Sequence, residues 1–118
     1  MKHETISIKG MVFPTMVVES EAEHQTGLMN RPWPPPVMTF PYQHASPRKF
    51  WMKNTVSPLD IIFCRAGRVV GIYKGEPLST TLVGPNEPSD LVVELPAGTA
   101  EKLGLKAGDY VGYAPTER

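Results

Sequence analysis

Residues 50–63 hold the densest group of side chains that could do chemistry, in the order FWMKNTVSPLDIIF. In an extended chain, alternate side chains share a face, so Trp51 and Lys53 point the same way. They would form the floor and the charged side of a pocket for a planar or anionic ligand. Asp60 follows inside an apolar run, where a carboxylate needs a partner because burial raises its pKa. The segment predicts a ligand cleft near Trp51, Lys53 and Asp60, with Asn54 as a further contact.

The same residues also fit a purely structural role, and the sequence leaves both interpretations open. Lys53 would then lie along the Trp51 ring and form a buried ion pair with Asp60. In the catalytic alternative, Asp60 and Lys53 would form an acid–base site, helped by Asp109 or Glu94. The structural and the catalytic interpretations differ in geometry. A structural ion pair would be buried, whereas an enzyme needs Lys53 and Asp60 exposed together in one cleft.

A second aromatic feature is Trp33, which stands in the proline-rich tract RPWPPP at residues 31–36. Prolines and aromatic rings are used to recognise peptides and sugars, and they also form rigid lids over the ends of barrels. Trp33 is therefore a further candidate ligand contact.

Patterns for metal, nucleophilic or phosphate chemistry are missing from the sequence. His3, His24 and His44 are scattered without ligand spacing, so neither a metal nor a cofactor is predicted. No nucleophile elbow or glycine-rich phosphate loop is present. Cys64 is the single cysteine and ends an apolar run, which favours a small buried hydrophobe over a catalytic thiolate.

Composition narrows the classes of partner. The chain has 118 residues, and 12 basic side chains balance 12 acidic ones. We therefore expect one domain, residues 1–118, and no nucleic-acid or anionic-membrane partner, since both need a clustered positive field. No run is long enough to span a membrane, and the first ten residues lack the apolar core of a signal peptide. As written, the chain would be cytoplasmic, or exported if a leader has been removed.

Alternation, β-branched residues and 13 prolines predict a β-rich chain with many corners. Ser20 is a predicted N-cap, and Gly104 follows the second predicted helix. The predicted fold is mainly β (α+β): a small bent-sheet or barrel-like single domain with two short helices at its edge. Predicted strands cover residues 5–9, 11–18, 37–40, 49–55, 59–64, 68–73, 91–95 and 110–113, with helices at 21–26 and 99–103 and loops at 42–48 and 76–89. The predicted core is Phe40, Phe50, Ile61, Phe63, Val70 and Val93.

Several motifs in fixed order resemble those of a known family. FWMKNT followed by PLDIIF looks like the signature of domain of unknown function family 192. The resemblance covers residues 17–111 and departs from the family at residues 32–37, where an acidic, glycine-containing segment is usual. It implies a compact β-rich single domain and no known activity. Supporting motifs are EHQTGLMN at residues 23–30, MTF at 38–40, GRVV at 67–70, AGTA at 97–100 and GLKAGD at 104–109.

Taken together, the sequence favours a non-enzymatic ligand-binding, protein-binding or accessory module with a cleft near Trp51, Lys53 and Asp60. Its partner would be a small molecule, a peptide or a protein. The alternatives are a small enzyme with the Asp60/Lys53 site and a protein–protein adaptor that uses an exposed strand edge.

Overall fold

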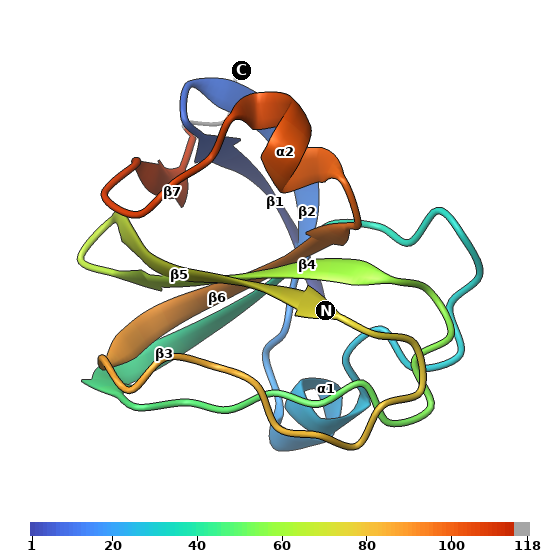
Figure 1. The fold of residues 1–118 in the computed structure, drawn as a ribbon. Coiled ribbons are helices and arrows are strands. Elements are labelled where there is room, and N and C mark those ends of the chain that lie inside the picture. The colour runs from blue at the N-terminus through green and yellow to red at the C-terminus, as the bar shows by residue number, and fades with distance from the viewer. Residues whose placement is uncertain (115–118) are drawn as a thin grey trace.

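The computed structural model describes residues 1–114 and contains seven strands and two short helices (Figure 1). This confirms the predicted mainly β fold with two short helices. The elements are β1 (Lys2–Ile8), β2 (Met11–Val17), α1 (Glu21–Thr26), β3 (Met38–Ser46), β4 (Leu59–Arg65), β5 (Arg68–Gly75), β6 (Ser89–Pro96), α2 (Thr99–Leu103) and β7 (Val111–Tyr113).

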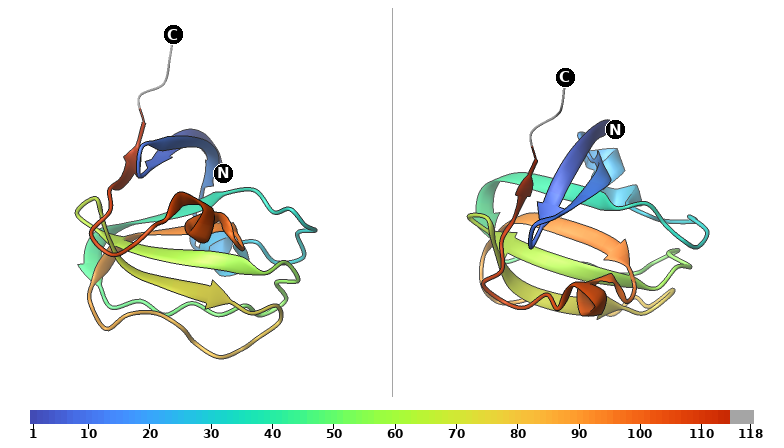
Figure 2. Two further views of the ribbon diagram at one scale, coloured as in Figure 1. Left: turned by 45° about the horizontal axis from the view of Figure 1, so that its top comes forward. Right: turned by 90° about the horizontal axis from the view of Figure 1, so that it is seen from above.

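All seven strands form one sheet in the order β5-β4-β6-β3-β2-β1-β7. Every neighbouring pair is antiparallel except β2 and β3, which run parallel over a short stretch. The sheet curls so that its two outer strands approach each other (Figure 1; Figure 2). At this point Arg68 and Tyr110 form an isolated bridge, and the Gly108 amide donates to the Val69 carbonyl at 2.8 Å. The result is a curled half-barrel.

Two tight turns set the register of the sheet. Lys9 and Gly10 join β1 to β2, and Ala66 and Gly67 join β4 to β5. All four residues have positive φ, between 50° and 84°, which is the geometry of a two-residue hairpin turn whose twist matches the strands. The predicted turn at residues 66–67 is confirmed.

The central strands β4 and β6 are buried on both faces. Along β4, Ile62 and Cys64 face a core closed by α2, whereas Ile61 and Phe63 face a core on the side of α1. We call these cores the α2-side cluster and the α1-side cluster, and α1 and α2 lie on opposite sides of the sheet (Figure 1). The α2-side cluster comprises Ile6, Ile8, Ile62, Cys64, Val69, Val93, Leu95, Ala100 and Val111. The α1-side cluster comprises Val18, Leu28, Met38, Phe40, Met52, Leu59, Ile61, Phe63 and Val92.

The core predictions hold for four residues and in part for two. Phe40, Ile61, Phe63 and Val93 are at most 1% exposed. Phe50 and Val70 are only half-buried and pack against the α1-side cluster. Cys64 is fully buried, and this burial raises the pKa of its thiol to about 12, so the prediction of a buried hydrophobe is confirmed.

Local sequence accounts for α1. The Ser20 hydroxyl accepts from the Glu23 amide at 3.1 Å, and the Glu23 carboxylate accepts from the Ser20 amide at 3.3 Å, which is a complete capping box. The chain leaves the helix at Gly27, whose φ is +47°. No residue within α1 is buried. The next residue, Leu28, is 2% exposed and anchors this end of the helix in the α1-side cluster.

Two sequence predictions were wrong. Residues 49–55 do not form a strand of the sheet; only Phe50 makes a bridge, to Val83, and the Met52 amide donates to the Ser79 carbonyl at 2.9 Å. This segment pairs with the long 76–88 loop. The loop supplies hydrogen-bond partners for backbone N–H and C=O groups that a neighbouring strand would otherwise supply. The predicted loop at residues 42–48 is largely strand, because β3 continues to Ser46 with a register shift after Pro41. Within residues 1–114, no helix is long and apolar enough to cross a membrane.

Candidate ligand-binding site

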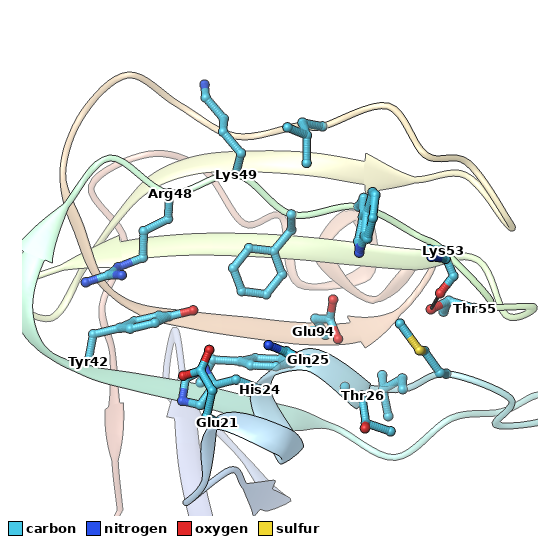
Figure 3. A pocket seen from close by; sticks show the side chains of 17 residues that line it. Glu21, His24, Gln25, Thr26, Tyr42, Arg48, Lys49, Lys53, Thr55 and Glu94 are labelled. Atoms are coloured by element: carbon cyan, nitrogen blue, oxygen red, sulfur yellow. Dashed lines mark hydrogen bonds between the residues drawn. The ribbon is translucent and has the colours of Figure 1, made fainter.

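A pocket of about 580 Å³ opens between α1 and residues 48–55 (Figure 3). The inner face of β3 and β6 forms its floor, and Leu82 of the long loop closes one side. We call it the α1 pocket. Its volume lies within the roughly 300–1,000 Å³ that is common for sites that hold small molecules.

Glu94 is the deepest charged or polar group of this pocket. It lies on β6 between Met38 of β3 and Ile61 of β4, on the apolar side of the sheet that faces α1. The residue is 4% exposed, and no hydrogen bond or ion pair of its carboxyl is found within residues 1–114. Burial raises the pKa of Glu94 from 4.5 to about 8. At neutral pH the group is therefore mostly a neutral carboxyl, with an O–H donor beside a carbonyl acceptor.

Gly27 allows the chain to pass close to this floor. A Cβ atom there would lie 3.5 Å from the Phe40 ring and 3.8 Å from Oε1 of Glu94. A side chain at Gly27 would therefore enter the space beside the carboxyl, and the positive φ would add strain. Glycine at this position keeps Glu94 open to the pocket.

Aromatic rings line the wall of the pocket. Phe40 and Phe50 meet edge to face with ring centroids 5.1 Å apart, and His24 lies 5.1 Å from the ring of Tyr42. Burial raises the pKa of Tyr42 to about 12, so its hydroxyl stays protonated. Such a wall suits a flat, apolar ligand body.

Three cations, Arg48, Lys49 and Lys53, also line the pocket, and within residues 1–114 only one of them lacks a protein partner. The Arg48 guanidinium stacks 3.4 Å from the Tyr42 ring and donates to the Ser89 carbonyl at 2.9 Å. Lys49 donates to the carbonyls of Gly84 and Pro85. Within the described chain, the Lys53 ammonium makes no hydrogen bond or ion pair, and it lies 5.3 Å from the centre of the exposed Trp51 ring. It is the cation that remains available to a ligand.

The structure places two of the sequence-predicted site residues at this pocket and one elsewhere. Trp51 and Lys53 line the α1 pocket, and so does Phe50, which alternation had placed on the opposite face. Asp60 is 6% exposed and lines a second pocket, of about 610 Å³, beside α2. There its Oδ2 atom accepts from the Gly98 amide at 3.1 Å and from the Ala100 amide at 2.9 Å.

The expected ion pair between Lys53 and Asp60 is therefore not found, and neither is the Asp60/Lys53 acid–base site. The two side chains line different pockets, because Asp60 alternates with Leu59 and Ile61 and faces the opposite side of β4. The hydrogen-bond partners of the Asp60 carboxylate are instead backbone amides at the start of α2, where these amides and the helix dipole favour a negative charge.

Asn54, Trp33 and Asp109 also lie outside the α1 pocket. Asn54 is an exposed turn residue with φ of +56°, and its carbonyl accepts from the Asn30 amide at 2.9 Å. Trp33 is 54% exposed and lines neither pocket. Asp109 caps its own turn by accepting from the Lys106 amide at 2.9 Å. No group of three or more residues that could hold a metal ion occurs in the part of the chain that the structure describes.

The sequence indicated Glu94 only as a helper of the acid–base site and Tyr42 only as part of an aromatic surface beside Trp33, and it gave no sign of His24 as a pocket residue. The sequence did contain a signal for Glu94, which is the one charged residue in the apolar run at residues 91–95. A charged residue in an apolar run needs a special environment, and the same argument had singled out Asp60. His24 had no such signal, because it meets Tyr42 only when α1 packs beside β3.

The profile of a family described as Uncharacterized ACR matches residues 4–113, which is nearly the whole chain. This chain belongs to the DUF192 family. The resemblance seen at residues 17–111 is thus confirmed, and the match extends it to the β1–β2 hairpin.

Two solved structures are similar to this DUF192 chain. A protein of unknown function from Novosphingobium aromaticivorans DSM 12444 is 33% identical, with a TM-score of 0.84 over 93% of this chain and 84% of that one. A protein from Sinorhizobium meliloti 1021, described as a putative transcription regulator, is 29% identical, with a TM-score of 0.86 over 95% of this chain and 94% of that one. Comparison with curated proteins finds no match.

Proposed function

We propose that this DUF192 protein is a small-molecule binding module and that the α1 pocket is its ligand site. The observation that carries the proposal is Glu94, a buried carboxyl without a protein partner at the floor of the pocket. The Glu94 oxygens open into the pocket, so a ligand that hydrogen-bonds to them would fill positions that no protein group occupies within residues 1–114.

The rest of the pocket supplies recognition groups. The half-buried ring of Phe50, backed by the buried ring of Phe40, offers an apolar surface, and Lys53 offers a charge that no protein group neutralises within the described residues. A mainly apolar pocket with a few convergent polar groups is the usual form of a ligand site. Binding accounts for this arrangement better than the acid–base alternative, whose two residues lie in separate pockets.

The test is an unbiased screen of small molecules by thermal shift, followed by amide chemical-shift mapping of the hits. We expect hits that raise Tm and perturb Gly27, Tyr42 and Glu94. Thr26→Trp, which fills the pocket from an exposed position on its wall, should abolish these shifts. Glu87→Gln, in an exposed part of the long loop, is the matched control and should leave them unchanged. Hits that persist in Thr26→Trp, or that map to the pocket beside α2, would overturn the assignment.

A further inference from the structure

We propose that the α1 pocket takes a planar nitrogen heterocycle that offers an adjacent hydrogen-bond donor and acceptor to Glu94 and an anionic group to Lys53. A nucleoside monophosphate has this chemistry. The inference rests on the proposed function, because it names the ligand class of the same pocket.

The first step is the hydrogen-bonding pattern of the floor. A neutral carboxyl presents one O–H donor and one carbonyl acceptor side by side, and either oxygen can carry the proton. Its complement is a ring edge with a donor next to an acceptor, such as the amino group and ring nitrogen of adenine, which amide side chains read in the same way. Glu94 is free to make both bonds, because no protein group occupies its carboxyl within residues 1–114.

The second step is the shape of the wall. The rings of Phe40, Phe50, His24 and Tyr42 form a continuous aromatic cluster along one side of the pocket, with centroid separations of 5.1–5.8 Å. Phe40 is buried and the Arg48 guanidinium stacks on Tyr42, so the half-buried rings of Phe50 and His24 are the ones left to stack on a ligand. Aromatic rings stack on heterocyclic bases with little preference for the base. A flat ring that reached Glu94 would lie beside this wall, because the same pocket is lined by Glu94 and by these rings.

The third step is the charge around the carboxyl. The titratable and charged groups that line the pocket with Glu94 are Glu21 and His24 from α1, Tyr42 from β3, and Arg48, Lys49 and Lys53 from the segment after β3. Cations outnumber anions among them, which disfavours a cationic ligand at Glu94. Arg48 and Lys49 already donate to backbone carbonyls, so the exposed Lys53 ammonium is the group that would meet an anion.

The experiment measures the affinity of four probes by calorimetry at pH 6.5, where Glu94 is protonated. The probes are AMP, adenosine without the phosphate, purine riboside monophosphate without the amino donor, and pterin-6-carboxylate. We expect AMP to bind roughly two- to fivefold more tightly than adenosine. We expect it to bind about tenfold more tightly than purine riboside monophosphate. If AMP binds more tightly than the pterin, the natural ligand is a nucleotide; if the pterin binds more tightly, it is a heterocycle that is not a nucleotide. Either result supports the inference.

Variants assign these differences to residues. Lys53→Ala should lower AMP affinity to that of adenosine and leave adenosine unchanged, whereas Lys102→Ala, exposed on α2, should change neither. Glu94→Gln should retain AMP binding, because an amide also offers a donor and an acceptor, and Glu94→Leu should lose at least about tenfold. At pH 9 the wild type should weaken as Glu94 loses its proton, whereas Glu94→Gln should not.

Equal affinity for AMP and adenosine would overturn the anionic part of the inference. Loss of binding in Glu94→Gln as complete as in Glu94→Leu would overturn the hydrogen-bonding part, because the carboxylate would then recognise a cation. Failure of every probe would overturn the ligand class alone; the proposed function would still be decided by whether the unbiased screen yields hits blocked by Thr26→Trp.

Discussion

The Glu94 carboxyl makes the stability of the fold depend on pH in an unusual direction. Its pKa is about 8 in the folded protein and about 4.5 without burial, so the folded state holds more protons between these two values. Stability from this group is therefore fully present below pH 4.5, falls as the pH rises and reaches its minimum above pH 8. Between pH 5 and pH 7 the loss amounts to about 2.5 kcal/mol.

The perturbation that isolates this effect is Glu94→Gln, which keeps the shape and removes the ionisation. Urea unfolding of the wild type and the variant at pH 5, 6, 7 and 8 gives the difference in unfolding free energy at each pH. We expect this difference to move in favour of Glu94→Gln by about 2.5 kcal/mol between pH 5 and pH 7 and by a further ~1 kcal/mol up to pH 8. Glu87→Gln, which alters an exposed carboxyl, should show no such trend.

A flat difference over this range would refute the argument. It would mean that Glu94 titrates near its ordinary value in the folded protein, and hence that water or a polar group stabilises its charge. The assignment of a neutral carboxyl to the floor of the α1 pocket would then fail, and with it the hydrogen-bonding pattern inferred for the ligand.

Three further predictions concern the frame of the site. Phe63→Ala removes a fully buried ring that meets Phe50 and Tyr73 edge to face, and it should lower the unfolding free energy by ~3–5 kcal/mol in urea titrations; a loss below ~1 kcal/mol would contradict its place in the core. In a double-mutant cycle by the same method, Asp60→Ala should cost about 1–3 kcal/mol, Lys53→Ala less than about 0.5, and their coupling should be close to zero, whereas a coupling above ~1 kcal/mol would restore the ion pair. The Cys64 thiol should resist a disulfide reagent at pH 8 in the folded protein and react fully in denaturant, and rapid labelling of the folded protein would show that the strand is not sealed.

Local patterns in the sequence predicted much of the fold, because hairpin turns, caps and alternation depend on neighbouring residues. Ala66 and Gly67 specify their turn, and Ser20 with Glu23 specifies the start of α1. Residues 49–55 misled the prediction, since their alternation is that of a strand but their backbone partners lie in the 76–88 loop. Alternation alone shows which side chains share a face and leaves the pairing partner undetermined.

The site was predicted in part for a similar reason. The exposure of Trp51 and Lys53 follows from alternation within a few residues, and the structure agrees. The sequence could not rule out an ion pair between Lys53 and Asp60, because it does not show which face of β4 Asp60 occupies. In the structure Asp60 faces α2, whose first backbone amides donate to its carboxylate. Proximity in sequence was a poor guide here, because the partner of Asp60 lies far along the chain at Gly98 and Ala100.

The pairing of β3 with β6 has a consequence for how the protein folds. The β1–β2 and β4–β5 hairpins close over two-residue turns, an event that takes about 1–10 μs in isolated hairpins. By contrast, Phe40 meets Val92, and Met38 meets Glu94, only after the long intervening chain has been ordered. Loop closure of this kind is the slow, entropically costly part of β-rich folding.

We therefore expect Glu94 to reach its apolar surroundings late, after both hairpins have formed. We expect the negative charge of Glu94 at pH 8 to raise the free energy of the folded state but not that of the transition state, so it should mainly speed unfolding. In stopped-flow experiments, Glu94→Gln should then slow unfolding while leaving the refolding rate nearly unchanged; an equal effect on refolding would show that β6 docks early. The α1 pocket would then be the last part of the half-barrel to form and the first to open.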